Sequence, residues 1–143
     1  MPYTYEFPMF GYTADAIVIA PDGGTYKVLL IQRKHDPYKD HWAFPGGFVD
    51  QDEVADQAVL RELKEETGLE VAHMSRLDVF DKVGRDPRGR TVTVAYTCML
   101  PQPVEGTAMD DAADVRWFDI NALPPLAFDH DDMMAMAIAR LGL

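Results

Sequence analysis

The feature that most restricts how this chain can fold is a helical segment that carries both an apolar stripe and a row of carboxylates. Ala55, Val59 and Leu63 recur every four residues, which predicts a helix over Glu53–Thr67 with one buried side. Such a stripe is buried only when a sheet or a second helix packs against it. The chain must therefore build a layered fold around this helix.

The ends of this helix carry residue types that start and stop helices. Asp50-x-x-Glu53 has the spacing of a capping box, in which two side chains bond to backbone N–H groups of the first turn. Gly68 follows the last turn, where a glycine ends a helix in the left-handed conformation, and Leu69 is placed for the accompanying apolar contact. These signals predict a helix that begins at Glu53 and ends before Gly68.

The acidic side of the helix suggests a metal site. Glu62 lies three residues before Glu65 and four before Glu66, so the three carboxylates project from one face of the helix. They lie near its C-terminal end, which disfavours negative charge because of the helix dipole. Following that face backwards gives Ala58 and Val54 rather than lysines. Clustered oxygens without neighbouring cations suit a hard divalent ion such as Mg²⁺. The alternative is a solvated acidic surface with no ligand.

Runs of aliphatic and β-branched residues predict five strands. The first two runs are separated by a Pro-Asp-Gly-Gly turn, and Thr91–Leu100 follows a tight turn that makes Met74–Val83 its antiparallel partner. A mixed sheet between helices, an α+β fold, is the expected architecture. In chain order, strands are expected at 14–20, 26–33, 74–83, 91–100 and 114–119, and a second helix at about 131–141 behind Asp129 as its N-cap.

Length and charge narrow the class of protein. The 143 residues suit one domain over 1–143, and the net charge of −11 disfavours nucleic acid and anionic membranes, since both need a basic patch. The longest apolar run has seven residues, against about 18–20 for a membrane span. The single cysteine excludes an intramolecular disulfide, so we expect a reducing, cytoplasmic setting. A phosphorylated substrate would be repelled by this chain unless a metal ion lay between them.

The acidic helix and the loop before it resemble the signature of the Nudix hydrolases. Gly47-x5-Glu53-x7-Arg61-Glu62-Leu63-x-Glu65-Glu66-x-Gly68-Leu69 has the family's residue at every defined position. The resemblance implies an α/β/α sandwich that hydrolyses a nucleoside diphosphate linked to a further group, with Mg²⁺ or Mn²⁺ as cofactor. It also implies roles for seven residues. Glu62, Glu65, Glu66 and the Gly46 carbonyl would hold the metal, Glu53 and Arg61 would pair to support the loop, and Gly47 would let the backbone turn sharply.

Segments outside the signature resemble the ADP-ribose pyrophosphatase branch, which implies cleavage of ADP-ribose into AMP and ribose 5-phosphate. Two alternatives stay open: hydrolysis of another substrate, such as an oxidised nucleoside triphosphate or a dinucleotide polyphosphate, and a sensor that binds ADP-ribose without turnover. Similar regulators continue into a DNA-binding domain and tend to have damaged signatures. Because this signature is complete and the sequence stops at Leu143, an enzyme is favoured. The segments are 13–18, 42–49, 84–90 and 126–130.

Arginines and aromatic residues are candidates for substrate contact. Arg33, Arg85 and Arg90 are expected to bind phosphate oxygens, because a guanidinium offers a fork of donors, although solvated arginines at a hairpin tip would look the same. The N-terminal aromatics could stack on adenine, or they could cover a hydrophobic face or the partner in a homodimer. The expected partner is a small phosphorylated nucleotide. These aromatics are Tyr3, Tyr5, Phe7, Phe10 and Tyr12. His130 has no evident partner in the sequence, and no role is assigned to it.

The general base is expected on a loop before the last strand. Attack of water on phosphorus needs a carboxylate to accept a proton, and the helix glutamates are already assigned as metal ligands. Asp110 and Asp111 lie in the middle of a segment rich in small residues, which could close over a substrate. The alternative base is Glu65 on the helix itself.

Overall fold

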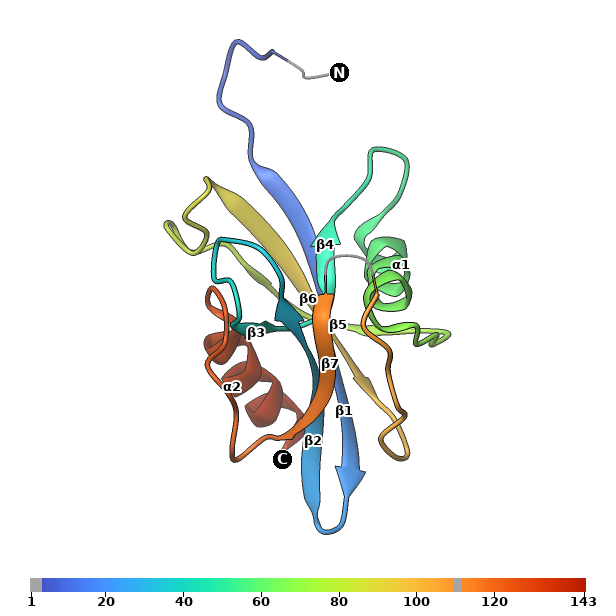
Figure 1. Ribbon diagram of the computed structural model, residues 1–143. Coiled ribbons are helices and arrows are strands. Elements are labelled where there is room, and N and C mark those ends of the chain that lie inside the picture. The colour runs from blue at the N-terminus through green and yellow to red at the C-terminus, as the bar shows by residue number, and fades with distance from the viewer. Residues whose placement is uncertain (1–3, 110–111) are drawn as a thin grey trace.

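The computed structural model describes residues 4–109 and 112–143. In this part of the chain a seven-stranded mixed sheet lies between two helices, α1 (Ala55–Thr67) and α2 (His130–Leu141), which flank it on opposite sides (Figure 1). Strands β1 and β6 run parallel, and every other pair is antiparallel. The predicted α+β sandwich is confirmed. The strands are β1 (Gly11–Asp22), β2 (Thr25–Arg33), β3 (Trp42–Ala43), β4 (Gly46–Phe48), β5 (Ser75–Phe80), β6 (Thr91–Met99) and β7 (Ala112–Asp119).

Strand β1 supplies both layers of the core, because successive side chains of a strand point to opposite faces. Ala14, Ala16 and Val18 belong to the cluster that includes the buried stripe of α1. Ile17 and Ile19 belong to the second cluster, on the side of α2. All of these side chains are fully buried. The central strand thus fixes the two helices on either side of the sheet.

Helix α1 ends where the sequence predicts and begins two residues later. Gly68 is left-handed, with φ of 77°, and its N–H donates to the Lys64 carbonyl over 2.8 Å. At the other end, Val54 occupies the N-cap position and no side chain caps the helix. The predicted capping box is half formed, since Glu53 accepts a hydrogen bond from the Asp50 N–H over 3.0 Å. The predicted start was wrong because Glu53 belongs to the loop, where Arg61 binds it.

Helix α2 covers the other face with its buried methionines. Met133, Met134 and Ala137 pack into the second cluster. Asp129 holds the predicted N-cap position, but its carboxylate does not cap the helix and instead pairs with Arg85 over 2.7 Å. Neither helix of the described residues is long and apolar enough to cross a membrane.

The separation of β1 and β2 creates the place for a site. The two strands pair only beside their hairpin, from Ile19 opposite Val28 to Asp22 opposite Thr25. Beyond that point β1 pairs with β4, and β2 pairs with β3. The segment that carries β3 and β4 therefore lies between the diverging strands, at the end of the sheet far from the hairpin. These two short strands were not predicted, because runs of two and three residues show no period.

Candidate active site

A cavity of about 500 Å³ opens where β1 and β2 diverge. Its walls include Asp15 of β1, Arg33 of β2 and the β4 backbone at Gly46 and Gly47. Helix α1 contributes its three clustered glutamates, and the start of α2 contributes His130. The volume lies within the range of small-molecule sites. The cavity thus combines the predicted acidic face with cationic side chains from other elements.

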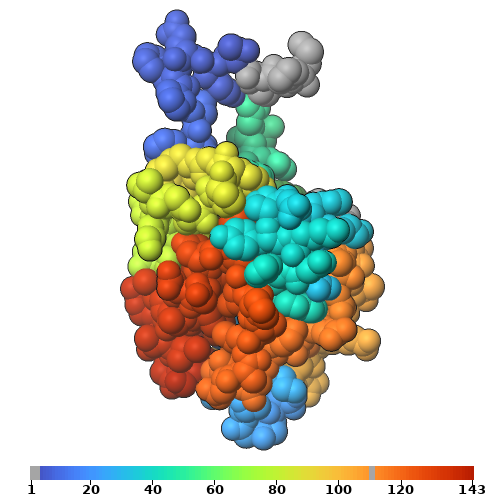
Figure 2. Space-filling view, turned by 60° about the vertical axis from the view of Figure 1, so that its left-hand side comes forward, coloured from blue at the N-terminus to red at the C-terminus, as the bar shows by residue number. Residues whose placement is uncertain are grey.

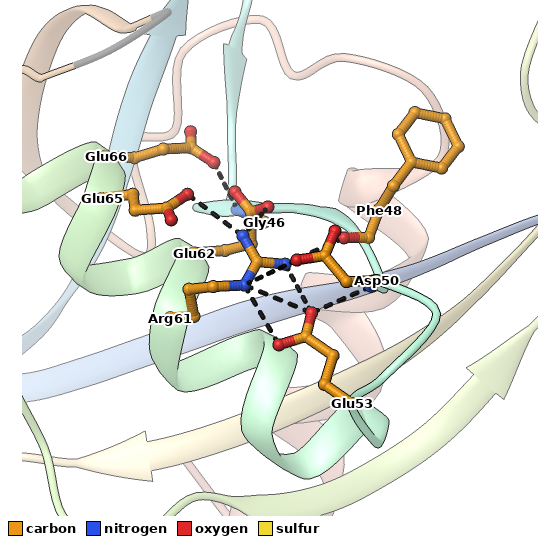
Figure 3. Close-up of polar contacts among 8 residues, drawn as sticks. All are labelled: Gly46, Phe48, Asp50, Glu53, Arg61, Glu62, Glu65 and Glu66. Carbon is orange, nitrogen blue, oxygen red and sulfur yellow. Dashed lines mark hydrogen bonds and ion pairs between the residues drawn. The ribbon is translucent and has the colours of Figure 1, made fainter. Parts of the chain in front are cut away.

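The three glutamates differ in burial. Glu66 is 7% exposed and its Oε1 accepts a hydrogen bond from the Gly46 N–H over 3.0 Å (Figure 3). Burial, with repulsion from Glu62 and Asp15, raises the pKa of Glu66 to about 9. Burial also raises the pKa of Glu62. Glu65 stands at the more open side, with 44% of its side chain exposed. Two of these carboxyl groups are therefore costly to ionise without a cation beside them.

Arg61 lies at the centre of this network. Its Nη2 donates to Glu53 over 2.5 Å and to the Phe48 carbonyl over 3.1 Å, which ties the loop to the helix (Figure 3). The predicted pairing of Arg61 with Glu53 is therefore present. Its Nη1 donates to Glu62 over 2.9 Å and to Glu65 over 3.1 Å. The expectation of carboxylates without a neighbouring cation was wrong, because the long arginine side chain reaches around to the face of the next residue.

Gly46 and Gly47 bring the loop close to the glutamates. A Cβ at Gly47 would lie 2.6 Å from the Glu62 carboxyl carbon, and one at Gly46 would lie 2.4 Å from the Ala14 carbonyl oxygen. Among the described residues, the glycines with positive φ do not include these two. The sequence-based reason for Gly47, a sharp turn, is thus replaced by a steric one. Only glycine leaves room for the Glu62 carboxylate.

The predicted phosphate-binding arginines are placed differently from one another. Arg33 donates from Nε to the Pro37 carbonyl over 2.7 Å, and its Nη1 and Nη2 have no hydrogen-bond partner among the described residues. Arg85 also lines the cavity, but its side chain is 4% exposed and forms a double hydrogen bond with Asp129. Arg90 donates to the Asp81 carbonyl and lies outside the cavity lining. The positions support a ligand contact for Arg33 and do not support one for Arg90.

Two further cavity residues, Phe128 and Arg88, lie next to Arg33. The Phe128 ring lies 4.9 Å from the Arg33 guanidinium carbon and 5.6 Å from that of Arg88. Arg88 is held by the buried carboxylate of Asp86 over 2.8 Å. Burial, together with repulsion from Arg88, lowers the pKa of Arg33. Two guanidinium groups beside one ring, in a chain of net charge −11, form a site suited to an anion.

The comparison with protein families agrees with this arrangement. The NUDIX domain matches residues 9–137, which include the sheet, α1 and the loop between β4 and α1. The chain belongs to the Nudix family. The Nudix glutamates of this chain are Glu62, Glu65 and Glu66, at the positions that the family signature defines.

Individual relatives are similar over much of the chain. The ADP-ribose pyrophosphatase of Methanocaldococcus jannaschii is 44% identical over 108 residues, which cover 76% of this chain and 63% of that protein. The ADPR responsive transcriptional repressor NtrR of Acinetobacter baylyi is 35% identical over 141 residues, which cover 96% of this chain and 56% of the repressor. The Nudix chain thus spans less than two thirds of either relative.

Among solved structures, the NUDIX domain of Shewanella oneidensis NrtR in complex with ADP ribose resembles this chain with a TM-score of 0.88. The two are 34% identical, and the match covers 94% of this chain and 90% of that one. The Nudix fold is therefore shown along nearly the whole chain. That neighbour was solved in complex with ADP ribose.

The Nudix glutamates fit a divalent metal ion, although no three acidic, histidine or cysteine side chains in the described parts already converge as a metal site. Arg61 occupies Glu62 and Glu65, and Glu66 faces the Gly46 N–H. Three carboxylates and a backbone carbonyl are nevertheless the oxygen donors that hard cations require. Since burial raises the pKa of two of these carboxyl groups, a bound cation would supply the missing compensation.

The predicted base residues Asp110 and Asp111 lie outside the described residues. The described part of their loop is anchored at the end of α1. The N–H of Thr107 donates to the Thr67 carbonyl over 2.9 Å, and that of Met109 donates to the Glu66 carbonyl over 3.1 Å. The loop therefore starts beside the Nudix glutamates. The alternative base, Glu65, lines the cavity directly.

Proposed function

We propose that this Nudix protein hydrolyses the pyrophosphate bond of a nucleoside diphosphate derivative, with ADP-ribose as substrate, Mg²⁺ as cofactor, and AMP and ribose 5-phosphate as products. The observation that carries the proposal is one cavity that combines all three Nudix glutamates with the Nη atoms of Arg33, which have no hydrogen-bond partner in the described part of the chain. The 44% sequence identity with an ADP-ribose pyrophosphatase supports the assignment of ADP-ribose as the substrate. Mn²⁺ is the alternative metal.

Different residues of the cavity would bind the metal, bind the phosphate and accept the proton during hydrolysis. Glu62, Glu65, Glu66 and the Gly46 carbonyl would hold the divalent ion, which would screen pyrophosphate charge and lower the pKa of the attacking water. Arg33 would bind the oxygens of one phosphate and hold the substrate in place. As the water oxygen bonds to phosphorus and the bridging P–O bond breaks, a nearby carboxylate accepts the water proton. That base is Asp110, Asp111 or Glu65.

Arg61 and Glu53 act one step removed from the substrate. Their contact, together with the bond from Arg61 to the Phe48 carbonyl, fixes β4 and the loop after it against α1. It thereby also fixes the Gly46 carbonyl, which is assigned to the metal. The hydrogen bond from Arg61 lowers the pKa of Glu53, so this pair stays ionised across the physiological pH range. We therefore assign both residues to support of the site.

A second candidate is a module that binds ADP-ribose without cleaving it. The similarity to the repressor NtrR over 96% of this chain is the observation that favours it. The complete set of Nudix glutamates favours the enzyme instead. A third candidate is hydrolysis of another substrate, such as an oxidised nucleoside triphosphate or a dinucleotide polyphosphate. This reaction would use the same glutamates as metal ligands, so it is distinguished from cleavage of ADP-ribose by its substrate and products.

One experiment separates these candidates. The purified protein is incubated with ADP-ribose, 8-oxo-dGTP or diadenosine tetraphosphate, each with Mg²⁺, Mn²⁺ or EDTA, and the products are resolved by anion-exchange chromatography. AMP and ribose 5-phosphate released from ADP-ribose with metal, and not by a Glu66→Gln variant, would establish the proposed reaction. Binding of ADP-ribose without products in any metal would establish the sensor.

The remaining assignments complete the proposal. The ligand is a small phosphorylated nucleotide, the protein acts as one domain over 1–143 in the cytoplasm, and no nucleic acid takes part, because the net charge of −11 opposes it. Since a relative is a transcriptional repressor, a gel-shift assay with duplex DNA tests the last point. A homodimer through the N-terminal segment stays an option, to be tested by sedimentation. The segment stands away from the body, and its exposed side chains are Tyr5, Phe7, Met9 and Phe10 (Figure 2), while Tyr3 lies outside the described residues.

A further inference from the structure

His130, at the start of α2, is a buried imidazole in the lining of the cavity. Its side chain is 4% exposed, and its ring stacks on Phe44 with centroids 4.8 Å apart. The Phe44 N–H donates to Nδ1 over 3.2 Å, so Nδ1 carries no proton and Nε2 carries the hydrogen. Burial lowers the pKa of His130, which keeps the ring neutral. The side chain therefore offers a fixed N–H donor.

Asp15, at the same wall, offers a fixed acceptor. Its Oδ2 accepts a hydrogen bond from Thr93 Oγ1 over 2.6 Å, which orients the carboxylate from the neighbouring strand β6. The same oxygen lies 3.9 Å from His130 Nε2, which is too far for a hydrogen bond. Within residues 4–109 and 112–143, His130 Nε2 has no hydrogen-bond acceptor. A donor and an acceptor thus face one another across a gap.

An oxygen does not fit on the 3.9 Å line between the two atoms, but a hydroxyl group beside that line can reach both of them. An oxygen about 2.7–2.9 Å from each atom would accept the hydrogen of Nε2 and donate its own hydrogen to the carboxylate. A phosphate oxygen fits poorly, because it has no hydrogen to donate to Asp15 and carries the same charge. An aromatic ring edge fits poorly too, because it would leave both polar groups unpaired.

We propose that Asp15 and His130 form a subsite for one sugar hydroxyl of the substrate. The pair lies in the same cavity as the Nudix glutamates, and Asp15 is the β1 partner of Gly46 in the β1–β4 register. A sugar attached to the pyrophosphate would therefore meet the pair while its phosphates lie at the glutamates and Arg33. This assignment rests on the proposed function and adds a residue pair that selects a sugar-linked diphosphate.

The test combines changes in the ligand with changes in the protein. Affinity is measured by calorimetry with Mg²⁺, for a non-hydrolysable ADP-ribose in which a methylene group replaces the bridging pyrophosphate oxygen, and for versions of it in which each ribose hydroxyl in turn is replaced by hydrogen. His130→Asn keeps an acceptor for the Phe44 N–H and removes the Nε2 donor, whereas His130→Gln can place an N–H near the Nε2 position. In Asp15→Asn an amide replaces the carboxylate, so one of the two acceptor oxygens becomes an NH₂ donor. Met134→Leu, a buried change elsewhere in α2, is the matched control.

For one hydroxyl position, removal should weaken binding to the wild type and to Met134→Leu about 10-fold or more, the value of a hydrogen bond to a charged group. His130→Asn and Asp15→Asn should lose that discrimination to within twofold, and His130→Gln should restore part of it. Equal discrimination in all variants would overturn the subsite and leave a water molecule as the bridge. Failure to bind or hydrolyse ADP-ribose at all would overturn the proposed function, and the subsite with it.

Discussion

Gly47 lies directly against the carboxyl group of Glu62: a Cβ at Gly47 would stand 2.6 Å from both Cδ and Oε1 of that side chain. Real atoms do not approach so closely, so any larger residue must move either the loop or the carboxylate. Because Gly47 has no side chain, β4 can lie directly against the Glu62 carboxyl group on α1. This contact explains the first glycine of the Nudix signature by packing rather than by backbone conformation.

Gly47→Ala should therefore damage the site more than the fold. We expect kcat/KM to fall more than 10-fold, since the methyl group displaces an assigned metal ligand, and the free energy of unfolding to fall by about 1–3 kcal/mol from overpacking. Urea unfolding and steady-state kinetics measure both. Adding Glu62→Asp, which shortens the side chain, should recover stability in the double variant without recovering activity. A double variant no more stable than Gly47→Ala would contradict the steric explanation.

Glu66→Gln should separate metal binding from folding. The amide keeps an acceptor for the Gly46 N–H, and burial already holds the pKa of Glu66 near 9, so the metal-free protein at pH 7 should be as stable as the wild type. Mg²⁺ at about 100 times its Kd adds about 2.7 kcal/mol to a protein that binds it. That gain should be lost in Glu66→Gln, along with activity. Glu70→Gln, an exposed change beyond the same helix end, should keep both.

Arg61 should contribute far more to stability than a surface arginine. Its guanidinium contacts Glu53, Glu62, Glu65 and the Phe48 carbonyl, and its removal leaves part-buried carboxylates without a partner. We expect Arg61→Ala to lower the free energy of unfolding by about 2–3 kcal/mol in metal-free buffer. Arg140→Ala, which breaks an exposed pair with Asp78, should cost less than about 1 kcal/mol. Equal costs for the two variants would show that Arg61 does not support the loop.

The fold was predictable because its main elements carry clear periods, whereas the site depends on contacts between distant segments. The stripe of α1, the stop at Gly68 and the alternation of β6 follow from local rules. Asp15 and His130 are 115 positions apart, and only the pairing of β1 with β4 and the docking of α2 bring them together. Arg85 looked like a ligand contact because nothing local shows that Asp129 binds it.

Arg33 and Arg90 make a matched pair for testing phosphate binding. Arg33 lines the cavity, and its Nη atoms have no partner within residues 4–109 and 112–143, whereas Arg90 lies outside the lining and stacks on Phe10. Arg33→Ala should raise KM for ADP-ribose about 10-fold or more and change kcat less, as expected for binding that is uniform through the reaction. Arg90→Ala should change KM by less than twofold. The reverse order of effects would move the phosphate contact to the hairpin.

His130 should make the stability of the protein sensitive to mild acid. Burial lowers its pKa from the ordinary 6.5, so the unfolded chain takes up this proton at a higher pH than the folded chain does. Stability from the neutral imidazole is thus present above pH 6.5 and is lost as the pH falls below it, by up to about 1.4 kcal/mol per pH unit. Urea unfolding of the wild type and His130→Gln between pH 7.5 and 5.5, in EDTA, isolates this group, since the other titrating side chains are common to both. The wild-type advantage should shrink towards pH 5.5, and parallel curves would show that His130 takes up its proton equally in the folded and unfolded chains.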